Sequence, residues 1–258
     1  MKQIRILAIG NSFSEDATHY LHQIAKADKI DTKVVNLYIG GCSLETHCNN
    51  INADAKLYLY QRDGKATEKY VSIKDALEEE DWDFVITQQS SPDSGLKKTY
   101  YPYIHQLFEY IKQYAPKAEV LLHQTWAYEI NSTHDCFGRY HHNQLEMYQA
   151  LHEAYNEAAA ELEVRIIPCG DVIQLVRTKV PFIYGQGGMS LCRDSYHMNY
   201  IYGRYLLAAT WYEVIFKRSI MNNTYIPKTI FAPDVVVDLH KLNVIKESVH
   251  QGNMEHIL

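Results

Sequence analysis

The sequence lacks the features that mark several large classes of protein. It has no block rich in Lys and Arg, and its formal net charge is -6, so it offers no clustered basic face to a phosphate backbone. No apolar run approaches the roughly 18 residues that a membrane-spanning helix needs. The sequence therefore predicts neither a nucleic-acid partner nor a membrane span.

Cysteine is scarce and irregularly placed. The five cysteines are Cys42, Cys48, Cys136, Cys169 and Cys192, an odd number without a C-x-x-C pair. This arrangement fits neither a disulfide framework nor a zinc ribbon, so we expect free and mostly buried thiols. The glycine patterns of dinucleotide-binding folds and P-loops are also missing, which makes a flavodoxin-like nucleotide binder a weak alternative. No cofactor is predicted.

The N-terminus superficially resembles a short export signal. After Met1 and Lys2, residues 4–9 form an apolar run, but the run is short and no small-residue cleavage site follows it. We expect this run to be a buried strand. On this interpretation the chain as it stands is cytoplasmic, and a signal removed before residue 1 would make the protein periplasmic or extracellular.

What the sequence does contain is typical of a folded globular protein. Apolar residues make up 47% and charged residues 22% of the 258 residues, a length near the upper limit for one hydrophobic core. No internal repeat, low-complexity tract or linker interrupts it. We expect one domain over residues 1–258, with a core at about 4–217 and a C-terminal tail, 220–258, packed on it.

Short apolar runs alternate with longer amphipathic segments, as in a parallel sheet covered by helices. Strands are predicted at residues 4–9, 33–39, 83–87, 118–123 and 164–168, and helices at 15–29, 99–114, 139–162 and about 199–217. Residues 54–72, around Asp63-Gly64, fit either a helix end or a small hairpin. The prediction is an α/β fold, a three-layer α/β/α sandwich around a five-stranded parallel sheet.

Parallel strands bring the residues that follow them to one edge of the sheet, where ligands bind. Ser12 lies at such a strand end, in Gly10-Asn11-Ser12-Phe13-Ser14, where the first strand leads into a helix. A serine hydroxyl acts as a nucleophile when a base takes its proton and donors stabilise the resulting oxyanion. A plainer alternative is that Ser12 or Ser14 only caps the helix.

A second motif, Asp194-Ser195-Tyr196-His197, precedes the last predicted helix. An aspartate three residues before a histidine can lie on the same face of a turn and hold the imidazole in the tautomer that accepts a proton. In a chain with 13 histidines, a surface Asp-x-x-His also arises by chance. The two motifs together are more informative, because the topology brings both to one edge.

Together these motifs resemble the SGNH (GDSL-like) hydrolase superfamily, which has a flavodoxin-like sandwich fold. Its nucleophile lies in a Gly-Asp/Asn-Ser block after the first strand, and its base lies in a late D-x-x-H block. The resemblance, over about residues 4–217, implies that Ser12 is the nucleophile, His197 the base and Asp194 its partner. The G-x-S-x-G elbow of α/β-hydrolases is absent.

The resemblance also implies an oxyanion hole. The family uses the N–H of the nucleophile, a glycine N–H after the second strand and an Asn side chain after the third. Gly40-Gly41-Cys42-Ser43 matches the glycine block, and Gln88-Gln89-Ser90-Ser91 stands where Gly-x-Asn-Asp is usual. We expect Ser12, Gly41 and Gln89 to form the hole. Gln89 is preferred to Gln88 because the alternation of the strand turns Gln88 toward a packed face.

The fourth block, residues 124–128, reads Gln-Thr-Trp-Ala-Tyr. With the Gln-containing third block, it most resembles a bacterial SGNH subgroup described as a domain of unknown function. Trp126 and Tyr128 are candidate substrate-binding residues, because aromatic faces suit sugar rings and acyl chains. The implied activity is hydrolysis of short acyl esters, with O-acetyl groups on carbohydrate as one substrate class.

Two alternatives stay open. The altered third block also fits a non-catalytic carbohydrate-binding protein that keeps the fold. The cluster of His134, Asp135, His141 and His142 could suggest a metal site, but its spacing is not that of the H-E-x-x-H motif. We expect a solvated polar loop there and predict no metal.

Overall fold

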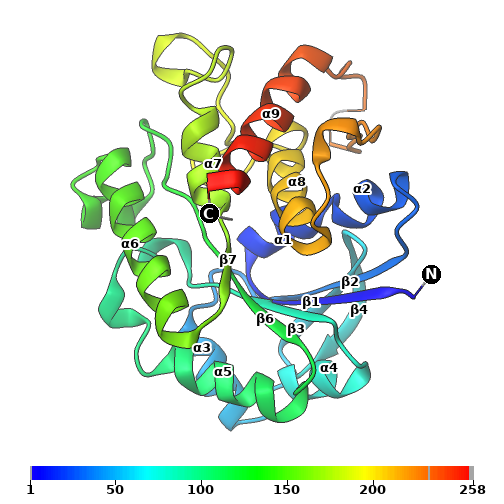
Figure 1. Ribbon diagram of the computed structural model, residues 1–258. Coiled ribbons are helices and arrows are strands. Elements are labelled where there is room, and N and C mark those ends of the chain that lie inside the picture. The colour runs from blue at the N-terminus through cyan, green and yellow to red at the C-terminus, as the bar shows by residue number, and fades with distance from the viewer. Residues whose placement is uncertain (1, 232, 256–258) are drawn as a thin grey trace.

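A mixed β-sheet organises the structure, a computed structural model that describes residues 2–231 and 233–255 (Figure 1). The strands are β1 (Ile4–Gly10), β2 (Thr32–Tyr38), β3 (Tyr58–Arg62), β4 (Lys65–Val71), β5 (Phe84–Thr87), β6 (Glu119–His123) and β7 (Arg165–Ile167). Their order in the sheet is β4-β3-β2-β1-β5-β6-β7. β2, β1, β5, β6 and β7 are parallel and correspond to the five predicted strands. The sheet therefore has seven strands, not five.

The two additional strands, β3 and β4, form a hairpin beside β2 in the segment that the sequence left undecided. β3 is antiparallel to both of its neighbours. Asp63 (φ 51°) and Gly64 (φ 80°) both have left-handed backbone, as a two-residue type I′ turn requires. Most side chains of β4 are exposed, so this strand shows no apolar alternation by which the sequence could reveal it.

Helices cover both faces of the sheet, which confirms the predicted α/β class. They are α1 (Ser12–Thr18), α2 (Leu21–Ala27), α3 (Leu44–Asn52), α4 (Ile73–Glu79), α5 (Tyr103–Tyr114), α6 (Gln144–Leu162), α7 (Cys169–Val176), α8 (Tyr202–Phe216) and α9 (Leu239–Glu255). α1, α2, α7 and α9 pack around α8 on one face, and α3, α4 and α5 pack together on the other (Figure 1). No helix in the described ranges has both the length and the apolarity to cross a membrane.

One predicted helix, over residues 15–29, is divided in two. α1 ends at Thr18 and α2 begins at Leu21. Between them, Nδ1 of His19 accepts a hydrogen bond from Arg204, and the hydroxyl of Tyr20 donates to the carbonyl of Tyr200 over 2.7 Å. These two hydrogen bonds connect the segment between α1 and α2 to the start of α8.

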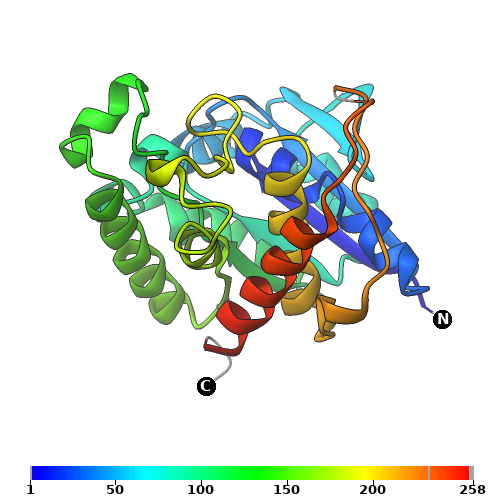
Figure 2. The same cartoon turned by 90° about the horizontal axis from the view of Figure 1, so that it is seen from above.

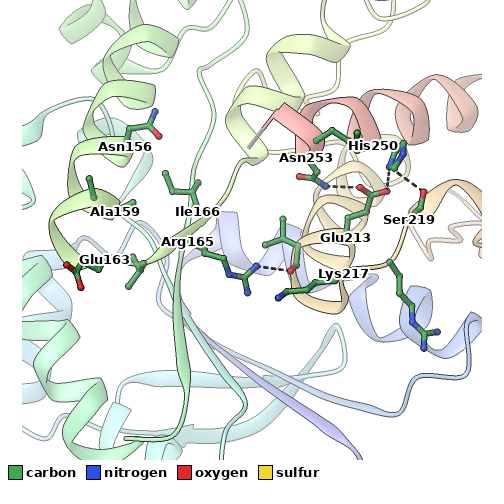
Figure 3. A pocket seen from close by; sticks show the side chains of 15 residues that line it. Asn156, Ala159, Glu163, Arg165, Ile166, Glu213, Lys217, Ser219, His250 and Asn253 are labelled. Atoms are coloured by element: carbon green, nitrogen blue, oxygen red, sulfur yellow. Dashed lines mark hydrogen bonds and ion pairs between the residues drawn. The ribbon is translucent and has the colours of Figure 1, made fainter. Parts of the chain in front are cut away.

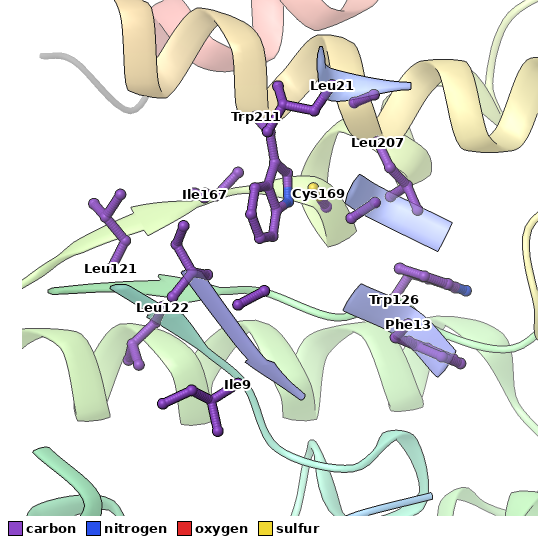
Figure 4. Packing of buried hydrophobic residues seen from close by; sticks show 14 of the residues in the cluster. Ile9, Phe13, Leu21, Leu121, Leu122, Trp126, Ile167, Cys169, Leu207 and Trp211 are labelled. Atoms are coloured by element: carbon purple, nitrogen blue, oxygen red, sulfur yellow. The ribbon is translucent and has the colours of Figure 1, made fainter. Parts of the chain in front are cut away.

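α8 is buried on nearly all sides, from Tyr202 to Glu213. The sheet covers one side, where Trp211 lies over β6 and β7 (Figure 4). α9 lies along another side (Figure 2), and its residues Leu242, Ile245 and Val249 are buried. The five cysteines are free and four are buried, as predicted.

The strand register brings the candidate loops together. Gly10 at the end of β1 pairs with Tyr38 at the end of β2, and Ile9 pairs with Thr87 at the end of β5. Thr87 in turn pairs with Leu122 of β6. The segments that follow these four strands therefore leave the sheet at the same edge.

Candidate active site

Ser12, His197 and Asp194 form a chain of hydrogen bonds at this edge. Ser12 is the first residue of α1, and its Oγ lies 2.8 Å from Nε2 of His197. Nδ1 of His197 lies 2.7 Å from Oδ2 of Asp194. Because a carboxylate can only accept, Nδ1 carries the proton and Nε2 is left to accept the proton of the Ser12 hydroxyl. The side chains of His197 and Asp194 are 19% and 41% exposed, so the site is open to solvent.

Residues 194–197, which we call the Asp–His turn, have a closely hydrogen-bonded backbone. Oδ1 of Asp194 accepts the N–H groups of Tyr196 and His197, and the N–H of Arg193 donates to the carbonyl of His197 over 2.9 Å. Burial opposes ionisation of Asp194, but the hydrogen bonds from the side chain and backbone of His197 outweigh it and hold the pKa of Asp194 below its ordinary value. The carboxylate therefore stays charged beside the imidazole.

Asn11, rather than Ser12, caps α1. The Asn11 side chain accepts the N–H of Phe13 over 2.9 Å, and the hydroxyl of Ser14 accepts the N–H of Asn11 over 3.0 Å, which completes a capping box. Gly10 must be a glycine here, because a Cβ would lie 2.3 Å from Oγ of Ser14. The Ser12 hydroxyl is thus not needed as a cap.

Asn11 also connects the loops that follow three strands. Its Nδ2 donates to the carbonyl of Cys42 after β2 over 3.0 Å, and its Oδ1 accepts from Nε2 of Gln88 after β5 over 2.8 Å. The Cys42 N–H closes a turn onto the carbonyl of Ile39, with Gly41 at φ 66° inside it. Asn11 therefore sets the position of the glycine turn relative to Ser12.

Gln89 does not fit the predicted oxyanion role. Its side chain is buried, and Nε2 donates to both the carbonyl and the hydroxyl of Thr99, at 3.0 and 3.2 Å. Oε1 accepts the N–H groups of Leu44 and Ser90. Both amide protons are occupied, so Gln89 holds the loops together and offers no donor to a reacting carbonyl. Gln88, the other candidate, uses its amide on Asn11.

Trp126 and Tyr128 do not fit the predicted substrate contacts, because both side chains are 0% exposed. Trp126 stacks on Phe13, with ring centroids 3.9 Å apart, and its Nε1 donates to the carbonyl of Tyr196 over 2.7 Å. The Tyr128 hydroxyl lies 3.0 Å from that of Ser91. Trp126 thus packs against α1 and holds the Asp–His turn through a hydrogen bond.

The histidine-rich loop around His134 makes local hydrogen bonds. Nδ1 of His134 accepts the N–H of Cys136, and His141 pairs with Glu146 at 2.7 Å. The ring of His134 packs against Tyr128 and Tyr196. Among the residues that the structure describes, His, Cys, Asp and Glu side chains do not gather in groups of three that could hold a metal ion.

The profile of a family described as a domain of unknown function, DUF4886, matches residues 5–242. The chain belongs to this family. A DUF4886 family protein from Bacteroides uniformis is 36% identical, with a TM-score of 0.89, over 98% of this chain and 95% of that chain. No curated protein matches the sequence.

More distant solved structures share the overall fold of this chain. A proposed SGNH hydrolase from Slackia heliotrinireducens is 20% identical, with a TM-score of 0.55, over 83% of this chain and 100% of that chain. An acetylxylan esterase from Geobacillus stearothermophilus is 13% identical, with a TM-score of 0.51, over 81% and 92% of the two chains. The predicted SGNH fold and the resemblance to a family of unknown function are confirmed.

A cavity of about 900 Å³, shown in Figure 3, is lined by residues other than Ser12, Asp194 and His197. It is lined by residues of α6, α8 and α9 and by the start of β7, including Arg165, Glu213 and His250. Ser12 follows the end of β1, and parallel strands begin at the opposite edge of the sheet from where they end. The cavity therefore belongs to the other edge.

Sequence reasoning missed the buried residue Asp16, which lies one helical turn after Ser12. It contacts Arg193 and Arg204 from distant parts of the chain. The available signal was the spacing: residues four apart on a helix share a face, so an aspartate at this position lies on the same side of α1 as Ser12. Its partners could not be identified from the sequence.

Proposed function

We propose that this protein is a serine esterase that hydrolyses short acyl esters through an acyl-enzyme. The observation that carries the proposal is the hydrogen-bond chain from Ser12 through His197 to Asp194. His197 accepts the proton of Ser12 as Oγ attacks the ester carbonyl, and Asp194 stabilises the imidazolium that forms. The alcohol leaves with the proton from His197. Water then attacks the acyl-enzyme with His197 again as base, which releases the acid and restores Ser12.

The tetrahedral intermediate needs hydrogen-bond donors for its oxyanion. We propose the N–H of Ser12, which begins α1 and so has no acceptor within its own helix, and the N–H of Gly41. The turn around Gly41 uses the N–H of Cys42 for its own hydrogen bond, and Gly41 is exposed, with open space where a Cβ would stand. The Gln89 side chain is left out, because its amide is occupied by Thr99.

The substrate class that we propose is a short acyl ester of a bulky alcohol, with O-acetyl groups on carbohydrate as the first candidates. The exposure of Asp194 and His197 supports it, because an open site accepts a large alcohol beside the reacting carbonyl. The fold-level likeness to an acetylxylan esterase supports testing acetylated sugars first.

Turnover of acetyl, butyryl and longer p-nitrophenyl esters, followed by acetylated xylo-oligosaccharides, tests this proposal. We expect the acetyl esters to react fastest and Ser12→Ala to lose about 10⁴-fold or more in kcat. Ser72→Ala is the matched control, since Ser72 also stands at a helix start but only caps α4. This control should keep full kcat and lose about 1 kcal/mol of stability.

A covalent probe separates the proposal from the carbohydrate-binding alternative. A fluorophosphonate should label Ser12 in the wild-type protein and leave Ser12→Ala unlabelled. Binding of sugars without labelling and without turnover of any ester would contradict the proposal and favour the non-catalytic protein.

A further inference from the structure

We infer that Asp16 is a positioning residue that holds the Asp–His turn against the helix that carries Ser12. The inference rests on the proposed function, because it explains how that function's base reaches its nucleophile. Asp16 acts through Arg193 and Met198, the two residues that directly precede and follow the Asp–His turn.

Asp16 contacts the residues on both sides of the Asp–His turn. Its carboxylate is 0% exposed, and Nη1 of Arg193 lies 3.0 Å from both of its oxygens. Oδ2 also accepts the backbone N–H of Met198 over 2.9 Å. The same Arg193 nitrogen donates to the carbonyl of Met198, and Cys192 and Met198 form an isolated β-bridge. One side chain of α1 therefore binds both ends of the loop that presents Asp194 and His197.

The position of Asp16 on α1 makes these contacts relevant to chemistry. Ser12 and Asp16 lie four residues apart in a helix that begins at Ser12, so they share one face. Movement of the turn relative to this face changes the distance from Oγ of Ser12 to Nε2 of His197, which is 2.8 Å. Misplacement of a reacting group by about 1 Å can lower a rate about 10²-fold.

Arg204 also holds the carboxylate of Asp16 in place. Its Nε donates to Oδ1 of Asp16 over 2.8 Å, and its side chain is 6% exposed. The guanidinium groups of Arg193 and Arg204 lie 4.9 and 5.0 Å from the ring centroid of Tyr200. Asp16 is thus the acceptor that two guanidinium groups share around one aromatic ring, and an amide in its place could not balance their charge.

Crystal structures and kinetics of Asp16→Asn and Arg193→Met test the inference. We expect both variants to lose the 2.8 Å contact between Ser12 and His197 while keeping the contact between His197 and Asp194. We expect kcat to fall about 10²-fold with KM within about twofold, because substrate binding is not touched. Arg193→Met keeps the Arg204 and Met198 contacts of Asp16, so it serves if Asp16→Asn does not fold.

Glu213→Gln is the control for a merely structural effect. Glu213 is a buried carboxylate near the far end of α8 that accepts the N–H of Ile220 over 2.7 Å. We expect this variant to lose thermal stability and to keep the wild-type kcat per folded molecule. The double variant Asp16→Asn/Arg193→Met should lose little more activity than the single variants, since the two residues act through one contact.

The structural readout distinguishes a failure of this inference from a failure of the proposed function. If wild-type protein neither turns over esters nor reacts with a fluorophosphonate, the proposed function fails, and the crystal structures still decide whether Asp16 positions the turn. If Asp16→Asn and Arg193→Met both fold with the contact between Ser12 and His197 intact, the inference is overturned. Unchanged kcat in both variants of an active enzyme overturns it as well.

Discussion

Three histidines, of which His47 and His123 are buried and His19 is partly buried, should make this protein sensitive to mild acid. Burial lowers the pKa values of His19, His47 and His123 to about 3 each, and for His19 the charges of Arg204 and Arg193 add to the effect. Hydrogen bonds agree with neutral rings: Nδ1 of His123 accepts from Nε1 of Trp211 over 2.8 Å, and Nδ1 of His19 accepts from Arg204. In the unfolded chain each imidazole takes up a proton near pH 6.5.

The sign and size of the effect follow from this difference. Between about pH 6.5 and 3 the unfolded chain binds more protons than the folded protein, so the free energy of unfolding falls as the pH falls. Each histidine contributes about 1.4 kcal/mol per pH unit, and the three together about 4 kcal/mol. From pH 7 to pH 5 the loss is about 6 kcal/mol, comparable to the whole stability of many domains.

Urea denaturation at pH 7, 6 and 5, followed by circular dichroism, measures this slope. The stabilising contribution of Asp194, whose pKa is lowered, is lost only as the pH falls toward its folded pKa, so the range from pH 6 to 5 mainly reports the histidines. His123→Asn keeps an acceptor for Trp211 and should reduce the slope by about a third. A slope below about 1.5 kcal/mol per pH unit, or an unchanged slope in His123→Asn, would refute the reasoning.

Three further predictions concern the residues around the site. Gln89→Ala should lower the free energy of unfolding by about 2–4 kcal/mol, because two buried N–H groups lose their acceptor. The kcat of the folded fraction should stay unchanged. A large fall in kcat at equal stability would restore Gln89 to the oxyanion hole. Trp126→Phe keeps the stack on Phe13 but leaves the Tyr196 carbonyl without its donor. Ester assays should therefore show kcat reduced about tenfold, and urea melts should show a free energy of unfolding lower by about 1–3 kcal/mol. Ser195 has φ 73°, so thermal melts should show Ser195→Val destabilised by about 2 kcal/mol and Ser195→Gly nearly unchanged; equal melting temperatures for the two variants would contradict this account.

The parallel part of the sheet and the residues of the candidate triad could be predicted from the sequence alone. β1, β2, β5 and β6 are short apolar runs bounded by turn residues, and such runs reveal buried strands without any knowledge of their neighbours. Ser12 could be singled out because it follows a strand and begins a helix. Asp194 and His197 could be paired because three residues of separation is a local relationship.

Which side chains are free to act at the site and which hold it together depends on tertiary contacts. Gln89 and Trp126 have suitable chemistry for an oxyanion donor and a substrate platform, but Thr99 occupies the amide of Gln89, and Trp126 is buried under Tyr196. The hairpin of β3 and β4 escaped prediction because an exposed edge strand needs no apolar pattern. Asp16 escaped it because its partners, Arg193 and Arg204, lie far along the chain. Burial and the occupancy of hydrogen-bonding groups depend on contacts between distant segments. The pattern of residues along the chain does not show which of these segments meet.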